Sequence, residues 1–329
     1  MGILLLSLSS MITEIGTDVS VAAAHLKRGE IVAIPTETVY GLAGNALDNE
    51  AVISIYEAKQ RPKFNPLIIH LPSIDEAAKY VKEIPETVRQ LAAVFSPGPL
   101  SYLLPKTSLV PDLVTAGSDK VVVRIPAHPM ALALLKQLDF PLAAPSANPF
   151  GYVSPVTADH VKEGLNGKIP YILDGGPCPV GVESTIIGME GNDLVIHRLG
   201  GVGAEDIFRV TGIMPRYSLL HERPDTPGQL KSHYAPGKPL VVGNVDELIG
   251  AYAGREIAVI SFRKNYEVGD CRILSPKGDL HEAASKLFAT LRELDRSEAD
   301  IILAEIFPHE GIGMAINDRL SRANSSAPV

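Results

Sequence analysis

Two arginines of this sequence stand where charged side chains are unusual. Arg124 lies in the apolar run KVVVRIP (120–126) and Arg198 in LVIHRLG (194–200), and both runs are typical of buried strands. A buried charge is costly unless it is paired, so each guanidinium needs an acidic partner or an anionic ligand. For Arg124 the pattern leaves both possibilities open. A pocket that gathers such arginines could bind carboxylate or phosphate groups.

More cations lie in KQRPKFNPL (59–67), at the end of a predicted helix. Lys59, Arg61 and Lys63 could meet a triphosphate there, and the planar guanidinium of Arg61 could make bidentate contacts. The alternative is simply favourable charge at a helix C-terminus. Lys120 is a further candidate, because alternate residues of a strand share a face and it therefore points the same way as Arg124.

Polar loops follow several predicted strands. PTETVYGL (35–42) places two threonine hydroxyls and a carboxylate directly after a buried strand. This loop could bind a small polar ligand, or its hydroxyls could only shape the turn. Other loops carry hydroxyl and amide groups of the kind that hold phosphate or ribose oxygens. These are Ser146, Asn148 and Ser154 in APSANPFGYVSP (144–155), and Ser184 and Thr185 in GVESTII (181–187).

Several motifs of common enzyme classes are missing from the sequence. It has no GxxxxGK[ST], GxGxxG, GxSxG or HExxH and no EF-hand loop. GGVGAE (200–205) lacks the third glycine of a dinucleotide fingerprint and is more typical of a turn. The two cysteines, Cys178 and Cys271, lie far apart and outside any metal-ligand spacing. A disulfide framework and a structural zinc site are therefore not expected, and a reducing compartment fits the chain.

Net charge and hydropathy limit which nucleic-acid or membrane partners the protein can have. The 329 residues carry a net charge of −8, divided as −6 over residues 1–213 and −2 over residues 214–329. Neither part has the basic excess of a nucleic-acid clamp, so at most weak RNA binding is expected. MGILLLSLSS has only four consecutive apolar residues and no basic start, which fits neither a membrane span nor a signal peptide. We expect a cytoplasmic protein without a membrane partner, with a ragged start over residues 1–11.

The pattern of elements predicts two units. Residues 12–213 are rich in strands that do not alternate regularly with long helices, which favours an α/β fold with a mixed sheet curved around a cavity. Residues 214–238 hold many prolines and no period, as in an extended linker. Residues 239–329 alternate strands and helices, which predicts a small Rossmann-like domain with a parallel sheet.

The predicted boundaries follow from apolar runs, caps and glycines. In the first unit, strands are expected at 31–35, 67–71, 97–105, 120–126, 141–148, 169–176, 184–189 and 194–200, and helices at 19–28, 49–59, 73–80, 85–95, 129–138, 158–165 and 204–210. In the second unit, strands are expected at 239–243, 256–262, 271–275 and 300–307, and helices at 245–253, 280–297 and 312–323. Asp48 or Asn49, and Thr157, are the expected N-caps.

In order and spacing these motifs resemble the YrdC-like domain of threonylcarbamoyl-AMP synthases, over about residues 12–212. The motifs are PTETVYGL, KQRPKFNPL, SPGPL, KVVVRIPAHP, APSANPFGYVSP, DGG, GVESTII and HRLG. TPGQLKSHYAP (226–236) and GIGMAINDRLSRAN (311–324) resemble the long form of that family, with Thr226 in place of the usual serine and Asp318 as an extra acid. The resemblance implies a YrdC-like sheet followed by a Rossmann-like C-terminal domain.

The resemblance also implies a reaction. The family uses L-threonine, bicarbonate and ATP to make threonylcarbamoyl-AMP, pyrophosphate and water, and a downstream complex transfers the threonylcarbamoyl group to a tRNA adenosine next to the anticodon. It implies Mg²⁺ on the ATP phosphates without dedicated protein ligands, and no protein nucleophile. A linker in which Tyr234 reaches the nucleotide would cover the site as a lid.

Carried over motif by motif, the resemblance implies roles for individual residues. The expected threonine-binding residues are Thr38, His70, Arg124, Ala144 and Ser184. The expected ATP-binding residues are Arg61, Asn65, Lys120, Ser146, Asn148, Ser154, Arg198 and Tyr234. Lys59 and Arg61 are expected to act electrostatically on the phosphates.

Three other interpretations stay open. The carbamoyl-adenylating domain of hydrogenase maturation resembles the same fold, but it normally belongs to a larger chain with zinc-binding and acylphosphatase segments that are absent here. An RNA-binding module would contradict the acidic charge balance. A regulatory nucleotide site in the second domain would fit its predicted fold, although a fold alone does not establish a site.

Overall fold

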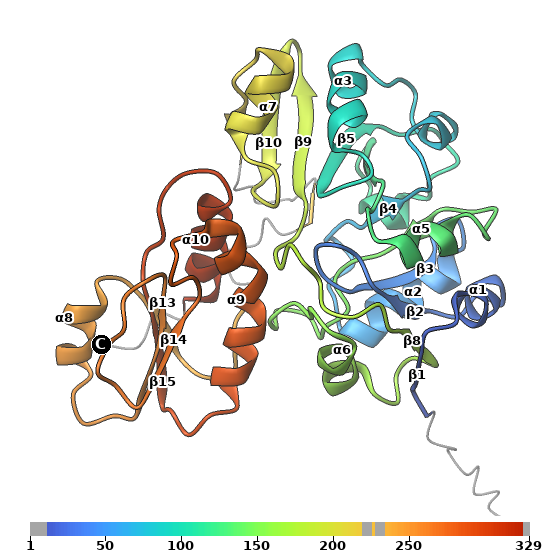
Figure 1. Cartoon of the computed structure of the whole chain (residues 1–329). Helices are drawn as coiled ribbons and strands as arrows, with labels where there is room; N and C mark the ends of the chain where they lie inside the picture. The colour runs from blue at the N-terminus through green and yellow to red at the C-terminus, as the bar shows by residue number, and fades with distance from the viewer. Residues whose placement is uncertain (1–11, 219–225, 228–233, 325–329) are drawn as a thin grey trace, which may run out of the picture.

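The structure is a computed structural model that describes residues 12–218, 226–227 and 234–324 (Figure 1). The first part of the chain builds a mixed sheet of eleven strands, in the order β1-β8-β2-β3-β7-β4-β6-β5-β9-β10-β11. Its strands are β1 (Glu14–Gly16), β2 (Val32–Ile34), β3 (Gly41–Asn45), β4 (Ile68–His70), β5 (Leu100–Pro105), β6 (Lys120–Arg124), β7 (Leu142–Ala143), β8 (Tyr171–Leu173), β9 (Thr185–Glu190), β10 (Asp193–Arg198) and β11 (Arg216–Tyr217). The predicted mixed α/β sheet is confirmed.

Helices connect these strands, most of them at positions that local sequence signals predict. They are α1 (Val19–Lys27), α2 (Asn49–Lys59), the 3₁₀ helix η1 (Asp75–Lys79), α3 (Glu86–Phe95), α4 (Asp112–Thr115), α5 (Pro129–Leu135), α6 (Ala158–Leu165) and α7 (Ala204–Thr211). Asp48 caps α2 by accepting a hydrogen bond from the Glu50 amide at 3.0 Å, and Thr157 caps α6 through the His160 amide at 3.2 Å. Both predicted N-caps are therefore confirmed.

Strand register brings distant motifs to one place. β4 and β6 run parallel with His70 opposite Arg124, and β5 runs antiparallel to β6 with Ser101 opposite Arg124. An isolated bridge joins Gly41, from the PTETVYGL loop, to Ser146. The polar strand ends of the sequence therefore surround one region of the large sheet, although up to about 100 residues separate them in the chain.

The last part of the chain forms a four-stranded parallel sheet in the order β12-β15-β13-β14. Its elements are β12 (Leu240–Val242), α8 (Val245–Ala251), β13 (Ile257–Ser261), β14 (Asp270–Ile273), α9 (Leu280–Asp295), β15 (Ile301–Ala304) and α10 (Gly313–Ala323). Helix α8 covers one face, while α9 and α10 lie on the other, between this sheet and the first unit (Figure 1). The predicted parallel sheet is confirmed, but β13 and β14 are joined by a loop without a helix.

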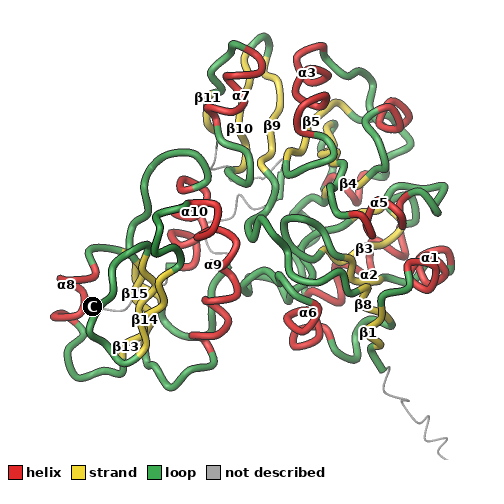
Figure 2. Tube along the Cα trace, in the orientation of Figure 1, coloured by secondary structure: helices red, strands yellow, loops and turns green. Residues whose placement is uncertain are grey.

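The sequence missed short elements that depend on tertiary contacts. β1 has three residues, too few to show a period, and is fixed by parallel pairing with β8. α4 occupies part of the segment between the strands predicted at 97–105 and 120–126, where no helix was expected, and the segment at 73–80 is 3₁₀ rather than a regular helix. The start of the predicted linker is not a free connection, because β11 pairs with β10 as the edge strand of the large sheet (Figure 2).

The two units meet through α9 and α10. The Tyr152 hydroxyl donates to Asp295 at 2.7 Å, and the buried guanidinium of Arg292 donates to the Val153 carbonyl at 2.6 Å while lying 4.8 Å from the Tyr152 ring centre. These contacts fix α9 against the loop that follows Ser146. No helix in the described part of the chain is long and apolar enough to cross a membrane.

Gly181 offers a test of how tightly the units pack. It has φ +76°, and a Cβ added there would lie 2.4 Å from the backbone of Ala284 and Ser285 in α9. We expect Gly181→Ala to lower the free energy of unfolding by about 3 kcal/mol or more, as positive φ and a backbone clash act together. The control Gly191→Ala shares the positive φ without a neighbour within 4 Å, and should lose only about 1 kcal/mol. Equal losses in urea unfolding would mean that α9 is not held against this loop.

Candidate functional site

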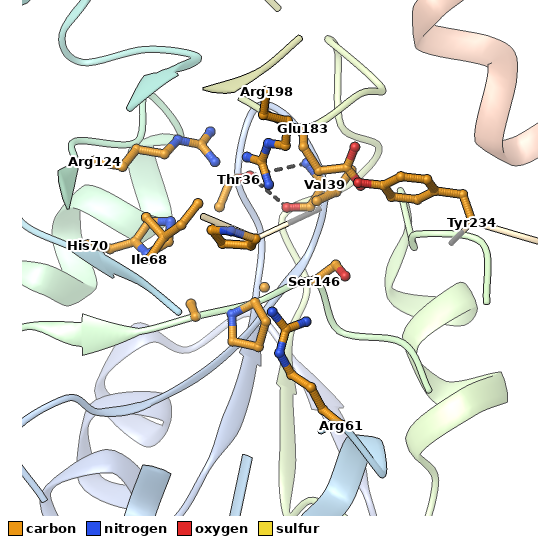
Figure 3. A pocket seen from close by; sticks show the side chains of 14 residues that line it. Thr36, Val39, Arg61, Ile68, His70, Arg124, Ser146, Glu183, Arg198 and Tyr234 are labelled. Atoms are coloured by element: carbon orange, nitrogen blue, oxygen red, sulfur yellow. Dashed lines mark hydrogen bonds between the residues drawn. The ribbon is translucent and has the colours of Figure 1, made fainter. Parts of the chain in front are cut away.

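One pocket of the structure collects residues from the ends of the large sheet and from the segment that joins the units (Figure 3). Most of its walls come from the polar loops that the sequence singles out. The lining residues are Thr36, Val39, Gly41, Arg61, Ile68, His70, Arg124, Ala144, Pro145, Ser146, Glu183, Arg198, Pro227 and Tyr234. Three arginines and one glutamate line this space, so its walls carry an excess of positive charge and suit anions.

Arg124 is both internally paired and directed at the pocket. Its Nη2 donates to Glu37 at 2.7 Å and to the Thr38 hydroxyl at 2.9 Å, and the other Glu37 oxygen accepts from the Ala127 amide at 2.9 Å. The internal ion pair, one of the two possibilities that the sequence left open, is therefore present, and a ligand contact stays a prediction. The buried Nε atom of Arg124 has no hydrogen-bond partner among the described residues, so a donor is left for a ligand.

His70 lies beside Arg124 because β4 and β6 place them opposite each other. Burial, and then the charge of Arg124, lower the pKa of His70 to about 3, so the imidazole is neutral at neutral pH. Its buried Nδ1 also lacks a partner within the described ranges. On the same side, the Thr36 hydroxyl contacts that of Thr38 at 2.9 Å and organises the turn by accepting from the Val39 amide.

Arg198 enters from β10 and is held by Ser184. Its Nε and Nη2 donate to the Ser184 carbonyl at 3.0 and 2.9 Å, and Nη2 also donates to the Ser184 hydroxyl at 3.0 Å. That hydroxyl is 2.7 Å from the hydroxyl of Ser101 on β5. Ser184 therefore supports the pocket wall from behind Arg198. Burial lowers the pKa of Arg198 to about 10, which leaves its charge intact near neutral pH.

Arg61 reaches the pocket from the side opposite Arg124 and Arg198 (Figure 3). It donates to the carbonyls of Asn65 at 3.2 Å and Pro66 at 2.9 Å, which uses two of its five N–H donors. Burial lowers the pKa of Arg61 to about 10, so it too remains charged. Three guanidinium groups that approach one space from different elements can neutralise an anion with several charges.

Lys59 ends α2, as the sequence predicts, but its side chain is buried. Its ammonium lies beneath the 146–148 loop, where it donates to the carbonyls of Ser146 and Asn148, and it does not line the pocket. Burial, and then the charge of Arg61, lower the pKa of Lys59 well below its ordinary value. The expected contact of Lys59 with phosphates stays a prediction, and in this structure Lys59 holds the loop that carries Ser146.

Most of the other expected site residues fall into two groups. His70, Arg124, Ala144, Ser146, Arg61, Arg198 and Tyr234 line the pocket, whereas Thr38, Ser184 and Ser154 lie behind it, bonded to residues that do. Lys120 begins β6, two residues before Val122, and Val122 pairs with the pocket residue Ile68. Lys120 itself does not line the pocket. Asn65 and Asn148 are fully buried, and both keep side-chain atoms without a partner in the described part of the chain.

Glu183 and Arg319 are the main residues that sequence reasoning missed. One Glu183 oxygen accepts from Ser154 at 2.6 Å, and the other accepts from Nε of Arg319 on α10 at 2.8 Å. Arg319 also donates to the Leu199 carbonyl at 2.8 Å and lies 4.9 Å from the Tyr234 ring centre. The second unit thus contacts two residues that line the pocket, Glu183 and Tyr234. Both residues stand in motifs singled out above, GVESTII and GIGMAINDRLSRAN, but no spacing could show that they meet.

Tyr234 closes the remaining side. Its φ is +66°, its ring stacks on Phe288 of α9 with centres 5.8 Å apart, and the side chain projects toward Glu183 (Figure 3). The space left in the pocket is about 50 Å³, whereas ligand pockets usually measure roughly 300–1,000 Å³. The pocket is therefore smaller than a nucleotide requires.

Comparison with protein families gives a consistent result. A family model described as "Telomere recombination" (Sua5_yciO_yrdC) matches residues 24–200, and one described as "Threonylcarbamoyl-AMP synthase, C-terminal domain" matches residues 202–325. The two matches meet near residue 201, between β10 and α7.

Curated relatives and solved structures match nearly the whole chain. Threonylcarbamoyl-AMP synthase of Pyrococcus abyssi is 42% identical, covering 93% of this chain and 94% of the relative, and the Bacillus subtilis protein of the same name is 40% identical, covering 92% and 91%. The crystal structure of P. abyssi Sua5 complexed with L-threonine superposes with a TM-score of 0.88 at 40% identity, covering 95% of this chain and 96% of that one.

The neutral state of His70 predicts a pH dependence of stability. Its pKa is about 3 in the folded chain but near 6.5 when unfolded, so the unfolded state binds the proton first as the pH falls. Stability from this residue is therefore lost as the pH drops below about 6.5, by about 2 kcal/mol at pH 5. Urea unfolding at pH 7 and pH 5 should show a smaller loss in His70→Asn. The exposed-site control His281→Asn should keep the full loss, and an unchanged loss in His70→Asn would contradict the assignment.

The contact between Arg319 and Glu183 predicts a large loss of stability. Burial acts to raise the pKa of Glu183, but the charges of Arg319 and Arg198 outweigh it and hold the carboxylate ionised. Arg319→Met should lower the free energy of unfolding by about 3–5 kcal/mol, because it leaves that carboxylate buried with a weaker partner.

A matched control is Arg296→Met, whose half-exposed pair with Glu163 should contribute only about 0–1 kcal/mol. The double variant Glu183→Gln, Arg319→Met should lose less than the sum of the two single variants. Additive losses would show that the two side chains do not interact.

Proposed function

The chain belongs to the threonylcarbamoyl-AMP synthase family, and we propose that it joins L-threonine, bicarbonate and ATP into threonylcarbamoyl-AMP, with release of pyrophosphate and water. The observation that supports this most is a basic, largely buried pocket in which Arg124 Nε and His70 Nδ1 have no partner in the described chain. Buried polar atoms are rarely left unpaired, so these two mark where a polar ligand belongs.

L-threonine is proposed to occupy the side of the pocket formed by β4, β6 and the PTETVYGL turn. The free donor of Arg124 suits its carboxylate, and the neutral His70 can exchange a hydrogen bond with a polar group without adding charge. Thr38 and Ser184 would act by holding the two arginines, and Ala144 would contact the methyl group. A site that pairs the threonine hydroxyl should reject valine strongly and serine only modestly.

ATP is proposed to lie on the other side, toward the 146–148 loop and the linker. Arg61 and Arg198 would contact the phosphates, and Ser146 lines the same wall. The unpaired amide atoms of Asn65 and Asn148 offer further hydrogen bonds to a nucleotide. Ser154 would act through Glu183, and Lys120 would meet only a triphosphate that extends along β6.

The reaction needs positioning and charge neutralisation from the protein. The threonine amine and bicarbonate form a carbamate with loss of water, and a carbamate oxygen then attacks the α-phosphorus of ATP as pyrophosphate leaves. Both partners are anions, so repulsion and misalignment dominate the barrier. The fixed guanidinium groups of Arg61, Arg124 and Arg198 oppose the repulsion without moving during the step. Such an enzyme is a nucleotidyltransferase.

Mg²⁺ is proposed to arrive as part of the ATP substrate. Glu37 and Glu183, the carboxylates beside the pocket, are each bonded to an arginine, so they suit a positioning role better than metal binding. The triphosphate oxygens would then be the ligands of the ion, and it would offset phosphate charge.

The linker is proposed to act as a lid. Tyr234 and Pro227 already border the pocket, and Tyr234 is held by Phe288 and Arg319 of the second unit. Movement of this segment would admit substrates and release product. The labile product would pass to a transferase complex that acts on tRNA.

Pyrophosphate release tests the proposal directly. With ATP and Mg²⁺ present, release should require both threonine and bicarbonate, and Arg61→Ala should lower kcat/KM by roughly 10²–10³-fold. The control Arg89→Ala, an exposed arginine of α3, should behave like the unchanged chain. Release that is indifferent to threonine would reject the substrate. Release with carbamoyl phosphate in place of threonine and bicarbonate would favour the hydrogenase-maturation type of reaction.

A further inference from the structure

A second cleft opens in the C-terminal unit, away from the pocket described above. It has a volume of about 550 Å³, which lies within the usual range for small-molecule sites, roughly 300–1,000 Å³. Its walls are the chain that follows β12, the chain that follows β13 and the chain that follows β15. All three strands are parallel, so the cleft lies at the carboxyl edge of the sheet.

The topology makes this edge a favoured place for a ligand. β12 and β15 are neighbours, but the chain leaves β12 toward α8 on one face and leaves β15 toward α10 on the other. Val245 of α8 packs with Ile301 and Leu303, whereas Ile316 of α10 belongs to the core with Ile302. Adjacent strands whose connections diverge in this way leave a crevice between them, and ligands of open α/β sheets bind in such crevices.

The side chains in the cleft offer three kinds of contact. Ile306 is 57% exposed at its lip, next to the paired rings of Phe262 and Phe307, which are 5.4 Å apart. Glu305 is fixed at the centre, since its carboxylate accepts from the Phe262 amide and from the Tyr266 hydroxyl, each at 2.5 Å. Arg263 is exposed at the edge and has no hydrogen bond or ion pair with the described residues.

We propose that this cleft is a second binding site, for a nucleoside monophosphate. The apolar lip would contact the base, the oriented carboxylate of Glu305 would accept from ribose hydroxyls, and the unpaired guanidinium of Arg263 would bind the phosphate. An inorganic anion would use only the arginine, and a purely apolar ligand would leave both charges unused. A nucleotide is the ligand class that uses all three kinds of contact in a space of this size.

One wall of the cleft is hydrogen-bonded to α10, the helix whose Arg319 contacts residues of the catalytic pocket. The backbone of Phe307 both donates to and accepts from the side chain of Asn317 on α10, at 2.8 Å in each direction. Two residues further along the same helix is Arg319, which contacts Glu183 and Tyr234. A ligand in the cleft would therefore contact the chain next to Phe307, which is hydrogen-bonded to α10, and α10 in turn contacts the catalytic pocket through Arg319.

Photolabelling of the full chain with 8-azido-AMP tests the site. Identifying the labelled peptides shows whether the probe bound in this cleft or in the catalytic pocket. We expect labelled peptides from 262–268 or 305–309, suppressed by excess AMP. Arg263→Glu should reduce this labelling about tenfold, as lost charged hydrogen bonds imply. Ile306→Asp should also reduce it, whereas Arg255→Glu, which alters an exposed arginine outside the cleft, should not.

Both cleft variants change exposed side chains, so circular dichroism and urea unfolding should show that they remain folded. Labelling confined to the catalytic unit would overturn the proposal, as would labelling of the cleft that is unaffected by Arg263→Glu. Equal suppression by inorganic phosphate and by AMP would overturn the nucleotide assignment. None of these outcomes depends on whether the reaction proposed for the catalytic pocket is correct.

Discussion

The structure depends on keeping several arginines charged inside a nearly closed cavity. Arg61, Arg124 and Arg198 repel one another, and burial removes the water that would solvate them. Each is held by fixed acceptors: Arg61 by two backbone carbonyls, Arg124 by Glu37 and Thr38, and Arg198 by Ser184. Because these acceptors come from separate strands and loops, the whole large sheet must form before the charges are accommodated.

The same constraint explains why the second unit is part of the site. Glu183 borders the pocket, and its charge is balanced by Arg319 from α10 as well as by Arg198. Arg319 also lies against Tyr234, so one side chain links the second domain, the pocket wall and the linker. A chain without the C-terminal unit would leave Glu183 buried beside Ser154 and without its closest cation. The docked domain is therefore an electrostatic component of the pocket, in addition to packing against it.

The arrangement also suits a reaction between two anions. A protein that must bring a carbamate to a triphosphate needs positive charge already in place, since reorganising water or side chains during the step would raise the barrier. The internal partners of the arginines hold them in fixed directions, while donors such as Arg124 Nε stay available. Lys59 contributes to the fixed geometry of the pocket indirectly, because it holds the loop that carries Ser146.

The sequence by itself determined the fold class and most regular elements, since apolar runs, caps such as Asp48 and Thr157, and strand periods are local signals. The sequence also indicated much of the pocket, because Arg124 and Arg198 lie in apolar strands, where a guanidinium needs an acidic partner or an anionic ligand. Only the tertiary structure decided which partners these are. The pairing of Arg124 with Glu37, the burial of Lys59 under a loop and the contact of Arg319 with Glu183 depend on register and docking between residues 87 to 136 positions apart, which no local spacing encodes.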